Sequence, residues 1–143
     1  MGKQRPQSLN FTLCNDLSEI QHIYQNLDRF LKHCCLSPRD YYSINLALEE
    51  WFINIVKYGY GDQSEHHIQI GVGFRNNVFR LTIIDDGRPF NPLEYPLPDL
   101  QKPLEERKIG GVELLLIQNL RDTVSYNRQN ETNILVLEKK VTV

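Results

Sequence analysis

The chain has 143 residues, of which 24% are charged and 41% hydrophobic, a composition typical of one soluble globular domain with its own core. Sixteen Lys and Arg against 18 Asp and Glu give a net charge of −2, which excludes the broad positive field of a nucleic-acid-binding domain. No stretch has the apolar run of a signal peptide or the roughly 20 apolar residues of a transmembrane helix. We therefore expect a single cytoplasmic domain over residues 1–143, with neither nucleic acid nor a membrane as partner.

The three cysteines are Cys14 and the adjacent Cys34 and Cys35. Their number is odd, and no two of them have the spacing of a metal knuckle. We interpret all three as reduced thiols.

The first part of the chain predicts a strand followed by a helix. Residues 1–8 are polar and predict a flexible N-terminus, whereas the apolar alternation over 9–13 predicts a strand. Asp16 and Glu19 have the spacing of a capping box. Apolar residues at helical intervals then predict an amphipathic helix that ends near Cys34.

A second helix is predicted from its capping residues. Ser37 is a good N-cap, Pro38 suits the first helical position, and apolar residues recur at helical spacing as far as Tyr58. Gly59 and Gly61 then end the helix.

The remaining regular elements predict two hairpins. One pairs residues 67–74 with 78–84 through the polar turn 75–77, and the other pairs 123–127 with 133–137 around Gln129 and Asn130. The fold class that follows is α+β. We expect a two-layer sandwich with a mixed, mainly antiparallel sheet and the helices on one face.

Between the hairpins lies a long segment with five prolines, and the segment 112–120 after it predicts a short apolar helix. A loop of this length inside a compact domain is usually functional. We interpret residues 86–109 as a lid.

Three polar residues share one face of the second predicted helix. Glu50, Asn54 and Lys57 fall within an arc of roughly 60°, among bulky apolar neighbours that leave little of the helix exposed. Such a trio could line a cavity and satisfy a phosphate and a metal ion. The same spacing also describes a solvated polar stripe, or an ion pair between Glu50 and Lys57.

Two further segments combine glycine with a position suited to a nucleotide. Asp85 ends an apolar strand just before Gly87, where a carboxylate could accept a hydrogen bond from a purine amine, although Asp-Gly is also a common turn dipeptide. Gly110 and Gly111 precede a predicted helix, whose free N–H groups favour a phosphate, although paired glycines also simply end loops. Neither a P-loop nor a dinucleotide-binding glycine motif is present.

Taken together, these three segments resemble the N-box and the two glycine boxes of the GHKL, or Bergerat-fold, ATPases. The strings DDGRPFNP and PLEERKIGG, each in its place, are similar to those of the stand-alone anti-sigma-factor serine/threonine kinases. The resemblance covers almost the whole chain.

The resemblance implies roles for these residues. Asn54 would ligate Mg2+, Glu50 would be the catalytic base, and Lys57 stands where the family often has a basic residue. Asp85 and Gly87 would bind the adenine of ATP. Gly110 and Gly111 would line its phosphates.

The resemblance also implies an activity and partners. The chain would be an ATP-dependent kinase that phosphorylates an anti-anti-sigma (STAS-like) protein and binds a sigma factor or similar regulator, with a homodimer as a candidate assembly. One departure supports a second hypothesis, a non-catalytic nucleotide-binding or protein-binding module. Glu113 stands where the family usually has a third phosphate-side glycine, and its carboxylate would repel a triphosphate unless it turns outward. Tyr58 replaces a common histidine.

Overall fold

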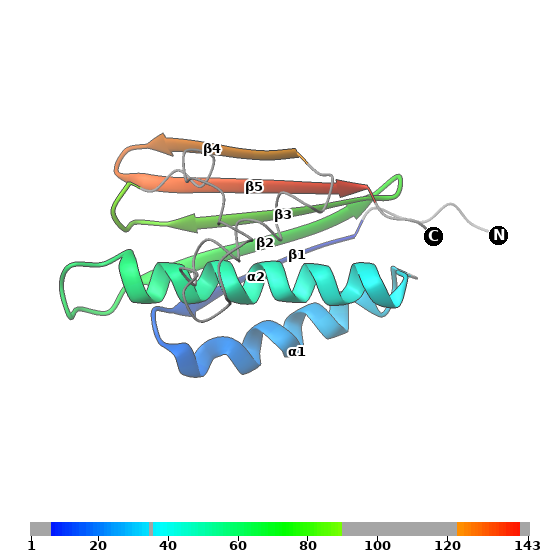
Figure 1. Ribbon diagram of the computed structural model, residues 1–143, viewed down its shortest axis with the longest axis horizontal. Coiled ribbons are helices and arrows are strands. Elements are labelled where there is room, and N and C mark those ends of the chain that lie inside the picture. The colour runs from blue at the N-terminus through cyan, green and yellow to red at the C-terminus, as the bar shows by residue number, and fades with distance from the viewer. Residues whose placement is uncertain (1–6, 35, 90–122, 141–143) are drawn as a thin grey trace, which may run out of the picture.

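The computed structural model describes residues 7–34, 36–89 and 123–140, which form an antiparallel sheet covered by helices (Figure 1). In chain order the elements are β1 (Gln7–Cys14), the 3-10 turn η1 (Leu17–Glu19), α1 (Ile20–Leu31), α2 (Pro38–Tyr58), β2 (His67–Arg75), β3 (Val78–Asp85), β4 (Thr123–Gln129) and β5 (Thr132–Lys140). The predicted fold class, a two-layer α+β sandwich, is confirmed. No helix in the described ranges is both long and apolar enough to cross a membrane.

The sheet has the strand order β1-β2-β3-β5-β4. Each neighbouring pair of strands is antiparallel, so the described sheet contains none of the parallel pairing that we expected in a mixed sheet. The pair β3 and β5 joins segments that are far apart in the sequence, with Asp85 opposite Asn133. This pairing brings the end of β3 beside the start of β5.

Both hairpins turn through two residues with left-handed backbone. Asn76 and Asn77 have φ values of 53° and 62°, and Asn130 and Glu131 have 52° and 65°. Positive φ at both central positions is the geometry of type I′ turns, which match the twist of the flanking strands and favour asparagine. The second turn lies one residue later than we predicted, and Arg75 belongs to β2 rather than to the first turn.

The structure corrects the predicted N-terminal boundaries. Gln7 and Ser8 are part of β1 and pair with β2, so they do not belong to a flexible terminus. The Asp16 side chain accepts a hydrogen bond from the Ser18 N–H and caps η1. Glu19 accepts from the Cys14 N–H instead of completing a capping box with Asp16.

The first long helix ends earlier than predicted and the second ends as predicted. α1 stops at Leu31, and the chain turns before Cys34. In α2 the Ser37 hydroxyl accepts from the Asp40 N–H at 3.1 Å, with Pro38 at the first helical position. The helix then runs to Tyr58 and ends at Gly59, as predicted.

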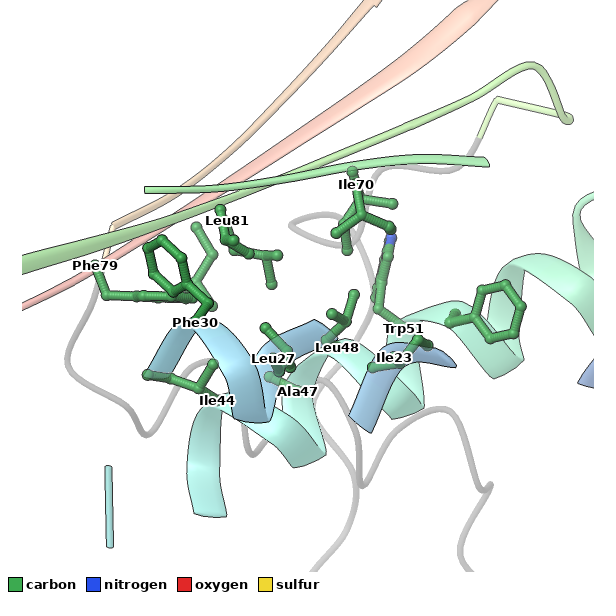
Figure 2. Close-up of a cluster of buried hydrophobic side chains, with 14 of the residues drawn as sticks. Ile23, Leu27, Phe30, Ile44, Ala47, Leu48, Trp51, Ile70, Phe79 and Leu81 are labelled. Carbon is green, nitrogen blue, oxygen red and sulfur yellow. The ribbon is translucent and has the colours of Figure 1, made fainter. Parts of the chain in front are cut away.

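The core lies between the helices and one face of the sheet (Figure 2). Alternate residues of β2 and β3 are buried, as expected for strands with one covered face. Phe52 of α2 and Phe79 of β3 are fully buried, and Phe79 packs edge-to-face against Phe30 of α1 with ring centroids 6.4 Å apart. Burial of each such side chain contributes about 1.5–3 kcal/mol, which fixes α2 against the sheet.

Figure 1 shows the C-terminal ends of α2 and β3 and the β4–β5 turn at the same end of the molecule. Several of the residues predicted to bind nucleotide belong to this end. Two of the cysteines, Cys14 and Cys34, lie in the described ranges, and both are free thiols.

Candidate functional site

The Asp85 carboxylate is buried at the C-terminal end of β3, where it is 6% exposed. Its Oδ2 atom accepts hydrogen bonds from the Gly87 N–H at 2.9 Å and from Asn133 Nδ2 at 3.1 Å. Its Oδ1 atom has no hydrogen-bond partner among the residues that the structure describes. Burial raises the pKa of Asp85, and the bonds from Asn133 and Gly87 act in the opposite direction. One carboxylate oxygen of Asp85 is therefore held by two donors, and the other accepts from no residue that the structure describes.

Asn133 of β5 holds the turn that follows Asp85. Its Nδ2 atom lies 2.8 Å from the Arg88 carbonyl oxygen and 3.3 Å from that of Gly87. Its Oδ1 atom accepts hydrogen bonds from the Tyr126 hydroxyl and, at 2.9 Å, from Arg128 Nη1. A satisfied polar network of this kind is rigid, so the strands β4 and β5 fix the position of Asp85.

Gly87 lies against the C-terminal end of α2. A Cβ atom at this position would be 2.6 Å from the Gly59 carbonyl oxygen and 2.9 Å from Asp85 Oδ2. The Arg88 N–H donates to the same Gly59 oxygen at 2.7 Å. Only glycine fits this approach, which joins the end of β3 to the end of α2.

The predicted polar trio lies in the C-terminal half of α2, before Gly59. At 100° per residue, Glu50 and Lys57 fall on the side of the helix opposite the buried Leu48 and Phe52, whereas Asn54 falls beside the buried Ala47. Glu50 and Asn54 are half-buried, and Lys57 is exposed. Their proposed contacts with metal and phosphate remain predictions, as do the roles of Gly110, Gly111 and Glu113, which lie outside the described residues.

A second polar cluster adjoins Asp85. The Tyr60 and His66 rings stack, with centroids 4.1 Å apart and planes 12° apart. His66 Nε2 lies 2.8 Å from an Asp62 oxygen, and its Nδ1 lies 3.2 Å from Asp86. The hydrogen bond with Asp62, followed by that with Asp86, raises the pKa of His66. Burial, followed by the negative charges of Asp85 and Asp86, raises the pKa of Tyr60.

Sequence reasoning missed Asn133, Arg128 and this second cluster. The alternation of Asn133 with Leu135 and Leu137 was a usable signal, because it places an amide on the buried face of a strand. His66 had no such signal. Its short connection between a helix and a strand shows no periodicity.

A family model described as the histidine kinase-like ATPase domain matches residues 13–139. The chain is also 30% identical over 98 residues to the serine-protein kinase RsbW of Oceanobacillus iheyensis, which covers 65% of this chain and 61% of that protein. It is 26% identical over 112 residues to the serine/threonine-protein kinase BtrW of Bordetella bronchiseptica, covering 76% and 79%. The first of these matches thus spans less than two thirds of its relative.

Solved structures show the same fold at low identity. A blue-light activated histidine kinase of Erythrobacter litoralis aligns with a TM-score of 0.54 and 17% identity, over 74% of this chain and 32% of that one. The histidine kinase AdeS of Acinetobacter baumannii aligns with a TM-score of 0.52 and 17% identity, over 93% and 68%. The fold is therefore that of histidine kinase ATPase domains.

Proposed function

Because the chain belongs to the histidine kinase-like ATPase domain family, we propose that it binds ATP with Asp85 against the adenine and transfers the γ-phosphoryl group to a serine or threonine of a protein. The observation that carries the proposal is the Asp85 carboxylate. One of its oxygens is held by Gly87 and Asn133, and the other has no partner within the described ranges. The exocyclic amine of adenine is a suitable donor for that oxygen.

Glu50 and Asn54 suit the chemistry of phosphoryl transfer. Asn54 offers an amide oxygen, a hard donor that fits Mg2+, and the bound ion would neutralise charge on the phosphates. Glu50, one turn away on α2, would accept the proton of the attacking hydroxyl. That oxygen forms the new bond to the γ-phosphorus while the bond to ADP breaks. Lys57 would add a positive charge near the phosphates.

We further propose that Gly110 and Gly111 cradle the phosphates and that residues 86–109 form the lid over the nucleotide. The named relatives are serine and threonine protein kinases, which supports a protein hydroxyl as the acceptor. An anti-anti-sigma (STAS-like) protein is the proposed substrate. A sigma factor or similar regulator is the proposed second partner. A second copy of the chain is a third candidate partner, which would form a homodimer.

Glu113 supports one alternative function, a non-catalytic regulatory module whose phosphate site no longer binds ATP productively. The Glu113→Gly substitution distinguishes the two. If the carboxylate occludes the phosphates, its removal should tighten ATP-Mg2+ binding about tenfold or more, or roughly 1.4 kcal/mol. If wild type already binds ATP in the micromolar range and the variant matches it, the kinase is favoured.

The direct test is calorimetric titration of the wild-type chain with ATP-Mg2+, followed by a transfer assay on STAS-domain proteins. We expect micromolar binding and a phosphorylated serine or threonine. Absence of binding in wild type with rescue by Glu113→Gly would favour the module. Absence of binding in both proteins would refute the nucleotide site.

A further inference from the structure

We propose that Cys14, Glu65 and His67 form a binding site for Zn2+ on the sheet edge at β1 and β2, separate from the nucleotide site. One ligand atom from each side chain, sulfur, oxygen and nitrogen, lies within 4.8 Å of the other two. Thiolate, carboxylate and imidazole are the ligand types that Zn2+ selects.

The backbone pairing brings the three side chains together. Cys14 of β1 and His67 of β2 are directly opposite each other, which places their Cβ atoms about 4.5–5.5 Å apart. Each is next to a buried residue, Leu13 and Ile68, so both lie on the sheet face away from the helices. Glu65, two residues before His67, continues on that side.

The distances are close to those of a tetrahedral site. Cys14 Sγ lies 3.1 Å from Glu65 Oε1, and that oxygen lies 4.0 Å from His67 Nε2. Ligand atoms around tetrahedral Zn2+ are about 3.4–3.6 Å apart, from metal–ligand bonds of about 2.0–2.3 Å. The Glu65 and His67 side chains are 68% and 63% exposed, so rotation of both can bring the three ligand atoms, which lie within 4.8 Å of one another, to the tetrahedral spacing.

Asn15 makes the scaffold rigid before any metal arrives. Its N–H donates to the His66 carbonyl at 3.1 Å, and its Oδ1 accepts from the His66 N–H at 2.9 Å. Its Nδ2 donates to the Ser64 carbonyl at 3.3 Å. Three bonds therefore tie the end of β1 to residues 64–66, between two of the proposed ligands.

The local charge also favours a divalent cation. The Glu19 carboxylate accepts from the Cys14 N–H at 2.9 Å, and Asp16 is two residues from Cys14. On binding, the sulfur–hydrogen bond of Cys14 breaks, the sulfur–zinc bond forms, and the proton passes to the buffer. Water completes the coordination, and the bound ion links the edge strand β1 to β2 through Cys14 and His67.

The test is titration of the full chain with Zn2+ in competition with a chromogenic chelator, and with Co2+ as a spectroscopic probe. Wild type should bind one Zn2+ in the micromolar range or tighter. With Co2+ it should show a thiolate-to-metal charge-transfer band. Cys14→Ser should abolish this band. Cys14→Ser and His67→Ala should each lower the affinity for Zn2+ by about a hundredfold, because loss of a residue that only hydrogen-bonds to a metal ligand already lowers affinity by about 10- to 100-fold.

Matched controls are Cys35→Ser and His33→Ala, which remove a thiol and an imidazole elsewhere in the chain and should bind metal as wild type does. Thermal unfolding without metal checks that each variant folds, and added Zn2+ should raise the melting temperature of wild type and of the controls only. The proposal is overturned if wild type does not bind, if the ligand variants bind as tightly as wild type, or if Cys35→Ser is the variant that loses the charge-transfer band.

Discussion

Replacement of Asp85 by asparagine is the sharpest test of the nucleotide site, because the change is nearly isosteric. The asparagine oxygen can take the place of Oδ2 and keep the bonds from Gly87 and Asn133. The amide nitrogen then replaces Oδ1, so an acceptor for the adenine amine becomes a donor. The variant should therefore lose ligand binding while it keeps its internal network.

The size of the loss follows from the charge on the acceptor. A hydrogen bond to a charged group is worth about 1.5–3 kcal/mol, which weakens ATP binding by about 10- to 150-fold. Stability should not fall in parallel. Burial raises the folded-state pKa of Asp85, so the free energy of unfolding of wild type decreases as pH rises from the ordinary aspartate pKa through the raised one. The asparagine variant has no such decrease.

The assay is calorimetric titration with ATP-Mg2+, together with thermal melts at acidic and neutral pH. Asp86→Asn is the matched control, because it removes the neighbouring carboxylate, which is 55% exposed and pairs with His66. Its ATP affinity should change little. The reasoning is refuted if Asp85→Asn binds ATP as wild type does, or if the two variants lose equal affinity.

Three further predictions address other parts of the site. Glu50→Ala should abolish phosphoryl transfer and spare ATP binding, whereas Asn54→Ala should weaken only the Mg2+-dependent binding of ATP. Transfer by Glu50→Ala at the wild-type rate would exclude Glu50 as the catalytic base. Gly87→Ala should lower the melting temperature and the ATP affinity, because the new Cβ would meet a backbone oxygen at 2.6 Å. Gly71→Ala is the control and should lower the melting temperature only slightly, because its Cβ would meet a side-chain oxygen at 2.9 Å. Equal melting temperatures of the two variants would contradict the packing argument. The two carboxylate partners of His66 raise its pKa. The protonated ring therefore contributes stability that is present below pH 6.5 and is lost as pH rises through the raised pKa. Between roughly pH 6 and 8, the melting temperature should fall more in wild type than in His66→Gln.

Most of the fold could be predicted because its signals are local. Ser37 with Pro38 fixed the start of α2, and strand alternation located β2 and β3. The errors lie where tertiary pairing decides. The pairing of Gln7 and Ser8 with β2 extends β1 by two residues, and Glu19 bonds to the end of that strand instead of to its own helix terminus.

The candidate site was predictable in part for the same reason. The position of Asp85 at a strand end is visible in the sequence, because the strand before it is apolar and a glycine follows. Its partner Asn133 is 48 residues away along the chain, so no local pattern can connect the two. The same holds for Cys14, which has no metal-ligand spacing to any other cysteine and meets Glu65 and His67 only through strand pairing.

The pairing of β3 with β5 has a consequence for how the chain can vary and fold. Asp85 and Asn133 close a loop that contains the whole connection from β3 to β4. The entropy cost of closing a loop grows only with the logarithm of its length, so doubling the connection would cost about 0.6 kcal/mol. Insertions there should leave stability nearly intact and chiefly slow folding, because the chain must find a contact of long sequence separation. A segment of the proposed nucleotide site can thus be lengthened or replaced while the sheet that positions Asp85 stays the same.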